Sequence, residues 1–397
     1  MVFYANPDYY PPTRNAAAIL SKYFEVTVVC RNMGRSVVRW PRQIAIERVG
    51  SGGSEDDRHR SNPIGKFIEL RNFMGAVRDV VARIQPTLIF AYEPHAFCAA
   101  LGSSRRIRMT PLIFQLHELP EFDDLPWRSL QTWVIRRAVR ETRAASLLIF
   151  PEKNRAEIWT RAARDTRPPL IIPNCAALGF TPDGYDVAGL IERRLAAKRV
   201  LYVGALGESN GHGEAVQSLA FLESSVSLQM VGQGSSEYRQ TLIRSAAELG
   251  VLARLSIGEF VEHARLTEPA RDATVGLALY KPVTLNWEFS GSATNKVFEY
   301  AALGLPVVAP DRASYREFFA DETWITFADP TDPRSIARAI EFVLADRARY
   351  ARMSLAARRA FEQKFNYERV FQPVLEQALA LAGASRPDDP ARPAAST

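Results

Sequence analysis

The sequence predicts an α/β protein made of two doubly wound parallel-sheet domains. Three observations lead to this prediction: short apolar runs alternate with helix-like segments, the alternation restarts in the second half, and 47% of the 397 residues are hydrophobic, enough for two compact cores. Ligands of open α/β sheets bind beyond the carboxyl ends of the strands. Two such sheets that face each other therefore enclose a cleft, where we expect the site.

Strands are expected wherever an apolar run is bounded by polar residues, Gly or Pro. In the first half these runs lie at 1–5, 26–30, 88–92, 111–116, 146–150 and 169–173. In the second half they lie at 199–204, 227–232, 255–258, 274–280 and 305–309. The helix-like segments between them predict the crossovers that parallel strands require.

The apolar periodicity fades between residues 174 and 186, which predicts a domain boundary there. We expect a first domain over 1–178 and a second over 179–360. The last segment, 384–397, is rich in Pro, Ala and Asp and has too few apolar residues to order itself, so a disordered tail is expected.

Composition argues against several classes of protein. The three cysteines, Cys30, Cys98 and Cys175, form no C-x-x-C pair, which disfavours a disulfide framework and a zinc site. No run of about 18 apolar residues and no apolar leader is present, so a membrane span and secretion are also disfavoured. We therefore expect a cytoplasmic protein.

Basic residues concentrate in the first half of the chain. Residues 1–180 hold 26 Lys and Arg against 17 Asp and Glu, whereas the net charge of the whole chain is +6. Arg136, Arg140 and Arg143 are spaced to lie on one face of a helix. This stripe indicates either peripheral docking on an anionic inner membrane face or only a solvated helix face. No nucleic-acid partner is expected.

The stretch 290–311, SGSATNKVFEYAALGLPVVAPD, contains a loop, a short helix and a strand. Ser292 or Thr294 can cap the helix, and Gly304 followed by Pro306 ends it. The positive end of such a helix suits a diphosphate, and Glu299, one turn further, could bind a ribose diol. The alternative is an ordinary helix between two strands.

The same stretch resembles the NK-x-x-EY-x-A-x-G-x-PV signature of the family 4 (group 1) glycosyltransferases. The matching residues are Asn295, Lys296, Glu299, Tyr300, Ala302, Gly304, Pro306 and Val307. The resemblance implies two Rossmann-like domains in the GT-B arrangement, with an acceptor-side domain first and a nucleotide-sugar-binding domain second. A helix over 361–383 would cross back to the first domain. Glu299 would bind the donor ribose.

Gly291 departs from the pattern of the family, which usually has a second Glu eight residues before Glu299. Glu288 is the nearest carboxylate that could take its place. We hypothesise that it reaches the sugar from a longer loop.

A Gly-rich loop, ALGESNGHG at 205–213, could bring backbone N–H groups to the donor phosphates. Where the family has an Arg and a Lys, this chain has Ala205 and Asn210, so another cation must stabilise the leaving diphosphate. Lys296 is the first choice, and His212 and Lys281 are the alternatives.

The resemblance assigns the remaining site residues to three places. The catalytic residues are His117, just beyond an apolar strand, and Lys296, although a lone His after a strand is commonly only structural. The donor-binding residues are Gly204, Gly207, Asn210, Gly211, Gly232, Phe260, Val261, Ser292, Thr294, Asn295 and Glu299. The acceptor-side residues are Tyr9, Tyr10, Arg14 and Glu118.

The resemblance implies a retaining glycosyltransferase, EC class 2.4, in polysaccharide biosynthesis. It would move a sugar from a nucleotide-diphosphate donor to a glycan, lipid-linked or polysaccharide acceptor. Because no D-x-D motif is present, neither a metal nor a cofactor is expected. Two alternatives stay open: a GT-B-like nucleotide-sugar-binding subunit or scaffold that has lost turnover, and a sugar-nucleotide epimerase of similar shape. The nucleotide base, the sugar, the acceptor and the oligomeric state also stay open.

Overall fold

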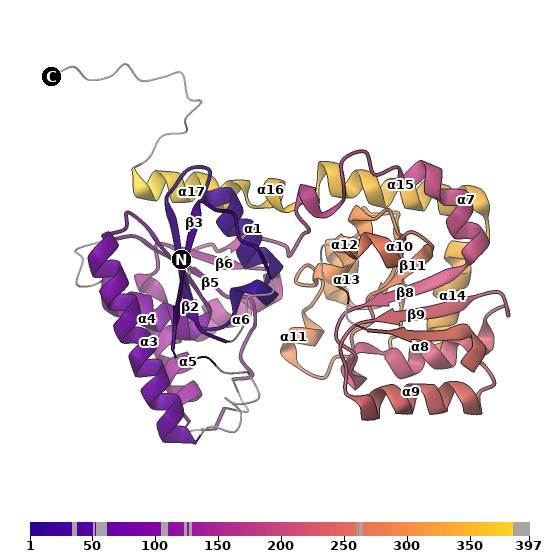
Figure 1. The fold of residues 1–397 in the computed structure, drawn as a ribbon, viewed down its shortest axis with the longest axis horizontal. Helices are drawn as coiled ribbons and strands as arrows, with labels where there is room; N and C mark the ends of the chain where they lie inside the picture. The colour runs from indigo at the N-terminus through magenta and orange to yellow at the C-terminus, as the bar shows by residue number, and fades with distance from the viewer. Residues whose placement is uncertain are drawn as a thin grey trace, which may run out of the picture. The chain divides into compact units, whose positions relative to one another are not determined.

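The structure, a computed structural model, describes residues 1–33, 38–50, 52, 62–104, 110–122, 125–126, 129–259, 261 and 265–383. The predicted α/β class is confirmed: the chain forms two parallel sheets with helices packed around each (Figure 1). It divides into two compact units, Met1–Ile172 with Val370–Thr397, and Pro173–Arg369. The expected tail, 384–397, lies outside the described residues.

In the first unit, seven strands form a parallel sheet in the order β3-β2-β1-β4-β5-β6-β7. They are β1 (Val2–Phe3), β2 (Val26–Arg31), β3 (Ile44–Val49), β4 (Ile89–Tyr92), β5 (Leu112–Gln115), β6 (Leu147–Phe150) and β7 (Leu170–Ile171). Strands β4 and β5 are buried along their whole length, which explains their continuous apolar runs. The order reverses between β1 and β4, and ligands of such sheets bind at the carboxyl edge of this switch point.

The helices of the first unit connect these strands. They are α1 (Pro11–Leu20), α3 (Pro63–Ile84), α4 (Glu93–Ser104), α5 (Leu130–Glu141), α6 (Lys153–Ala163) and α17 (Gln372–Ala382). The last of them, α17, belongs to this unit although it ends the described chain.

In the second unit, six strands form a parallel sheet in the order β10-β9-β8-β11-β12-β13. They are β8 (Arg199–Val203), β9 (Ser227–Val231), β10 (Leu255–Gly258), β11 (Ala273–Leu277), β12 (Val307–Pro310) and β13 (Ile325–Ala328). Here the switch point lies between β8 and β11. The loops that follow these two strands therefore lie where a ligand is expected.

Several helices of the second unit are short. They are α7 (Val187–Ala197), α8 (His212–Ser218), α9 (Ser236–Glu248), α10 (Thr267–Ala270), α11 (Leu285–Glu288), α12 (Asn295–Ala302), α13 (Ala313–Phe318), α14 (Pro333–Leu344) and α15 (Arg347–Gln363), followed by α16 (Tyr367–Val370) at the border of the two units. Helix α12 ends as predicted, because Gly304 adopts the left-handed conformation with φ of +64°.

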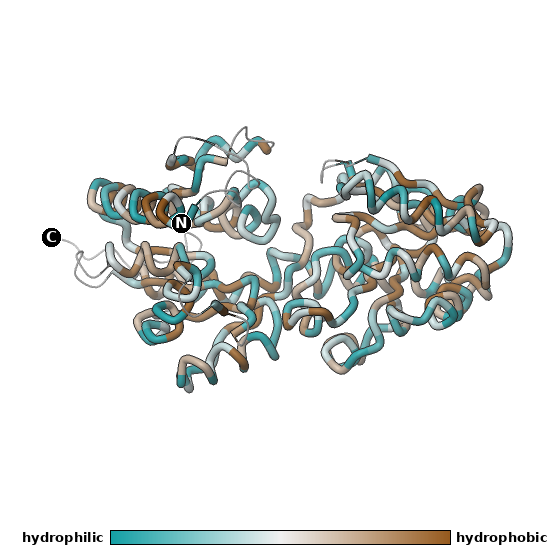
Figure 2. Tube along the Cα trace, turned by 90° about the horizontal axis from the view of Figure 1, so that it is seen from below, coloured by the Kyte–Doolittle hydropathy of each residue, from teal (hydrophilic) through white to brown (hydrophobic). Residues whose placement is uncertain are grey.

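Hydrophobic and hydrophilic stretches alternate along the helical turns of both units (Figure 2). On α14, for example, Ile336, Ala337, Ile340 and Val343 are buried in the core of the second unit. This spacing of three and four residues is the pattern by which the sequence predicts helices. Among the described helices, none is both long and apolar enough to cross a bilayer.

Candidate functional site

Lys296 is a half-buried cation of the second unit. It lies in the first turn of α12, where its Nζ donates a hydrogen bond to Tyr280 Oη at 3.0 Å and lies over the rings of Tyr202 and Tyr280, 5.2 and 5.1 Å from their centroids. Burial disfavours its charge, but the surrounding phenol oxygens outweigh burial and raise the pKa of Lys296 well above its ordinary value. The side chain therefore stays an ammonium group at neutral pH.

Gly204, at the carboxyl end of β8, leaves the space that Lys296 occupies. A Cβ atom at Gly204 would lie 2.5 Å from Lys296 Cε, and its φ of +130° is also unfavourable for other residues. Gly232, at the end of the neighbouring strand β9, is equally restricted, since its Cβ would lie 1.7 Å from the carbonyl oxygen of Gly204. These two glycines allow the strand ends and the lysine to lie close together.

The Gly-rich loop turns sharply after β8. Asn210 donates its side-chain amide to the carbonyl of Ala205 at 2.9 Å, and Gly211 has φ of +66°, with a Cβ position only 3.0 Å from Leu279 Cβ. Asn210 therefore stabilises the loop through this hydrogen bond and supplies no positive charge. Gly207 closes the turn, with its carbonyl 2.9 Å from His212 Nδ1.

The two alternative cations are less available than Lys296. Burial lowers the pKa of His212 to about 4, so this imidazole is neutral at pH 7. Lys281 Nζ lies 2.5 Å from Glu214 Oε1, and its charge is already paired. Of the three candidates, Lys296 alone keeps a charge that no described carboxylate neutralises.

Several buried polar atoms around the Gly-rich loop and α12 have no hydrogen-bond partner among the described residues. They are Asn174 Oδ1, Asn210 Oδ1, His212 Nε2, Glu214 Oε2 and Asn295 Oδ1. Leaving such a group unpaired costs about 1–3 kcal/mol. Such atoms near the half-buried cation Lys296 indicate a polar, anionic ligand.

The loop before α12 holds the other predicted donor residues. Thr294 is the N-cap residue, but its hydroxyl hydrogen-bonds to Tyr280 Oη at 2.8 Å and caps no backbone N–H, so the predicted capping role is wrong. The carbonyl of Ser292 accepts from the backbone N–H of Asn174 at 3.0 Å. Glu299 is buried in the next turn of the helix.

Gly291 cannot carry a side chain in this structure. A Cβ atom there would lie 2.5 Å from the carbonyl oxygen of Ser314, which is backbone and cannot swing aside. The absence of the usual first Glu is therefore built into the local packing. Glu288 lies half-buried at the end of α11, and its carbonyl accepts from Ser314 Oγ at 3.1 Å.

Arg239 connects the ends of two strands near the predicted donor-binding residues Gly232 and Val261. It donates to the carbonyl of Gly232 and, at 3.2 Å, to that of Gly258, so it joins the ends of β9 and β10. The sequence assigned no role to this residue. Val261 is half-buried, whereas Phe260 lies outside the described residues.

In the first unit, His117 follows β5 and is buried. Its ring stacks on Tyr92 with centroids 5.6 Å apart and planes at 5°, and its Nε2 lies 3.4 Å from Thr13 Oγ1. Burial, with a smaller contribution from Arg155, lowers the pKa of His117 to about 4. The imidazole is therefore neutral at pH 7 and can exchange hydrogen bonds, but it carries no charge.

The acceptor-side residues differ in their surroundings. The Tyr10 ring centroid lies 6.3 Å from that of His117, so these two are brought together. Tyr9 is 62% exposed, and Glu118 is exposed as well. Arg14 is half-buried near Asp8, which favours its charge, although burial lowers its pKa overall.

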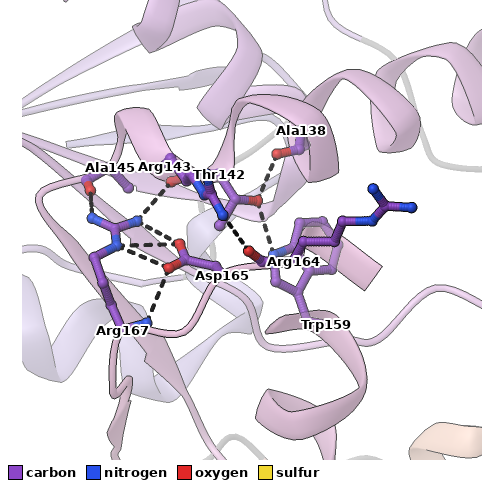
Figure 3. Close-up of polar contacts among 8 residues, drawn as sticks. All are labelled: Ala138, Thr142, Arg143, Ala145, Trp159, Arg164, Asp165 and Arg167. Atoms are coloured by element: carbon purple, nitrogen blue, oxygen red, sulfur yellow. Dashed lines mark hydrogen bonds and ion pairs between the residues drawn. The ribbon is translucent and has the colours of Figure 1, made fainter. Parts of the chain in front are cut away.

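One arginine of the predicted basic stripe is held by a hydrogen bond within the first unit. Arg143 lies beyond the end of α5, and its Nη2 donates to the carbonyl of Arg164 at 2.5 Å within a network built on Asp165 and Arg167 (Figure 3). Arg136 and Arg140, by contrast, line a pocket of about 370 Å³ together with Arg164 and apolar side chains. Two of the three arginines therefore remain as a basic surface.

No metal-ligand cluster of three His, Cys, Asp or Glu side chains is present in the part of the chain that the structure describes. The expectation that the chain uses neither a metal nor a cofactor stays a prediction from the sequence.

Residues 218–376 match the family described as glycosyl transferase-like. The chain is also 24% identical over 271 residues to glycogen synthase of Mycobacterium tuberculosis, a match that covers 66% of this chain and 62% of that protein's length. The chain thus spans less than two thirds of the curated relatives that it matches.

Two solved structures share the fold over nearly the whole chain. Sucrose-phosphate synthase of Thermosynechococcus elongatus is 17% identical with a TM-score of 0.72, covering 97% of this chain and 99% of that one. HepE of Anabaena in complex with UDP is 16% identical with a TM-score of 0.69, covering 96% and 98%. These similarities confirm what the signature around Glu299 predicts: the chain is a GT-B-fold protein that resembles the group 1 glycosyltransferases.

Proposed function

We propose that the chain is a retaining glycosyltransferase that moves a sugar from a nucleotide-diphosphate donor to a glycan, lipid-linked or polysaccharide acceptor. The observation that carries the proposal is the group of unpartnered buried polar atoms around the Gly-rich loop and α12, beside the cation Lys296. Diphosphate oxygens and ribose or sugar hydroxyls are the ligand groups that would satisfy them.

In this proposal, Lys296 and the backbone N–H groups of the Gly-rich loop stabilise the negative charge that develops on the leaving diphosphate. Glu299 accepts hydrogen bonds from the donor ribose. The neutral imidazole of His117 hydrogen-bonds to the sugar. A leaving-group oxygen takes the proton from the incoming acceptor hydroxyl on the same face of the sugar, so that the configuration is retained without a protein nucleophile.

Uridine diphosphate sugars are the donors to test first. The similar structures of HepE contain UDP and UDP-glucose. Incubation of the purified chain with a panel of nucleotide sugars is expected to release the nucleotide slowly from one of them. Binding of a donor without release, even with candidate acceptors, would favour the alternative of a binding subunit that has lost turnover, as Ala205, Asn210 and Gly291 would allow.

Replacement of Glu299 by Gln is expected to weaken binding of the donor nucleotide about tenfold or more, because a charged acceptor for the ribose hydroxyls is lost. Calorimetric titration with UDP and with an analogue lacking both ribose hydroxyls measures the effect. Wild type should discriminate strongly between the two ligands, and Glu299→Gln, which keeps only a neutral amide oxygen as acceptor, should discriminate less. Glu317→Gln, an exposed position on α13, is the matched control. Equal discrimination in wild type and Glu299→Gln would contradict the ribose assignment.

Contact with an anionic membrane is part of the proposal. The double variant Arg136→Gln, Arg140→Gln is expected to bind vesicles containing phosphatidylserine roughly thirtyfold more weakly, since each basic residue near such a surface contributes about 1 kcal/mol. Sedimentation with vesicles measures it. Arg143→Gln should weaken binding less, because that guanidinium is held at the carbonyl of Arg164 and lies near the carboxylate of Asp165. Equal binding by all three proteins would leave the stripe as a solvated face.

A further inference from the structure

We infer that Glu93 is a positioning residue for His117: its carboxyl group fixes the backbone turn that presents the imidazole. The inference rests on the proposed function, in which His117 contacts the sugar. Glu93 itself is the first residue of α4 and directly follows β4, the strand next to β5. It therefore lies beside the turn that leaves β5 at the carboxyl edge of the sheet.

The carboxyl group of Glu93 holds two successive N–H groups. Its Oε1 accepts from the N–H of His117 at 2.7 Å and from the N–H of Glu118 at 3.3 Å. The carbonyl of His117 in turn accepts from Arg155 Nη1 at 2.6 Å. Side chains from α4 and α6 thus fix both backbone polar groups of His117.

The backbone of Glu93 adopts a conformation that is unfavourable for a residue with a Cβ atom. Its φ is +66°, in the left-handed region, where a non-glycine residue costs of order 1–2 kcal/mol. Such a conformation persists only where the surroundings enforce it. Here it coincides with the two hydrogen bonds that reach across from α4 to the β5 turn, so the backbone and the side chain of Glu93 serve the same contact.

Two neighbouring side chains contact the imidazole ring of His117. Tyr92, the residue before Glu93, stacks on it, and Thr13 Oγ1 lies 3.4 Å from its Nε2. With the backbone held by Glu93 and the ring held by Tyr92, the ring orientation is determined before a sugar arrives. Orientation of this kind is what lets a neutral hydrogen-bonding group act on a reacting centre.

The charged and titratable groups that face Glu93 are Glu118, Arg155 and the neutral His117. Burial and, to a smaller extent, Glu118 raise the pKa of Glu93 to about 8, against the opposing effects of the two N–H donors and of Arg155. The carboxyl group is therefore mostly protonated at pH 7. The folded protein holds this proton from about pH 4.5 to about pH 8, whereas the unfolded chain has lost it, so this group lowers stability as pH rises through that window.

The experiment compares Glu93→Ala, Glu93→Gln and His117→Ala with Glu157→Gln, a matched control at an exposed position of α6. The titration of the His117 imidazole is followed by NMR and assigned with His117→Ala. In wild type the pKa should lie at about 4. It should rise toward the ordinary 6.5 in Glu93→Ala, where the turn is released, and stay low in Glu93→Gln, whose amide oxygen still accepts both N–H groups.

Where sugar transfer is measured, Glu93→Ala should lower kcat by up to roughly a hundredfold with little change in KM for the donor, as expected of a misplaced group, and Glu93→Gln should restore most of it. An unchanged kcat in Glu93→Ala, together with a low kcat in His117→Ala, would overturn the inference. If no protein in the series transfers sugar, the proposed function has failed. The imidazole titration still decides the positioning role, since an unchanged pKa in Glu93→Ala rejects it.

If Glu93→Ala does not fold, Glu93→Gln keeps the inference testable through stability. The free energy of unfolding of wild type, measured by urea denaturation, should fall relative to that of Glu93→Gln between about pH 5 and pH 8. Glu157→Gln should show the same pH dependence as wild type. Parallel curves for wild type and Glu93→Gln would show that the carboxyl group does not hold its proton. An imidazole pKa of His117 that rises toward 6.5 in Glu93→Gln would overturn the positioning role, since this variant keeps an acceptor for both N–H groups.

Discussion

The Lys296→Met variant is expected to lose about a hundredfold in turnover, the effect seen when one preorganised donor to a developing negative charge is removed. Methionine has a similar length and suits a site between the rings of Tyr202 and Tyr280, so the packing around Gly204 should survive. Nucleotide release and transfer from the donor, measured at saturating donor concentration, test it.

Lys281→Met is the comparison for this variant, because Lys281 is half-buried but paired with Glu214. Its loss should lower turnover less than tenfold. If Lys296→Met turns over as fast as wild type, Lys296 does not stabilise the leaving diphosphate. A larger loss in Lys281→Met than in Lys296→Met would assign that role to Lys281 instead.

The second large effect is expected for Gly291→Glu, which restores the carboxylate that the family usually has. It should lower the free energy of unfolding by about 3 kcal/mol, since even the Cβ atom would lie 2.5 Å from the carbonyl oxygen of Ser314. Thermal and urea denaturation measure the loss. Turnover should fall with it.

Gly179→Glu provides the control for the same chemical change, because a Cβ atom at Gly179 meets nothing within 4 Å and this exposed residue belongs to the same unit. Its stability should stay within about 0.5 kcal/mol of wild type. A Gly291→Glu protein that is as stable as wild type and turns over faster would show that the loop can accept the missing Glu.

Most strands of both sheets could be predicted from the sequence because the inner strands are buried on both faces, as the continuous apolar runs 88–92 and 305–309 show. The edge strands β3 and β13 are only partly buried and were not predicted. The end of α12 was predictable for a local reason, the left-handed Gly304. The role given to the Thr294 hydroxyl failed for a non-local one, because Tyr280 competes for that hydroxyl.

Contacts between residues far apart in sequence account for most of what the sequence did not show. The backbone of Ser314 leaves no space for a side chain at Gly291. Lys281 cannot serve as the free cation because Glu214 pairs with it. Glu93 is one of many glutamates at a strand end, and nothing local marks its left-handed backbone or its bonds to the turn after β5. Arg143 likewise fits the stripe by spacing, but the carbonyl of Arg164 binds it.

The phenolic surroundings of Lys296 have a consequence for ligand exchange. When a lysine is paired with a carboxylate, an anionic ligand must first displace that carboxylate. The displaced carboxylate then repels the bound ligand. Tyr202 and Tyr280 instead hold the ammonium group through a hydrogen bond and ring contacts. No described carboxylate pairs with Lys296, so an incoming anion can bind this ammonium group without first displacing one.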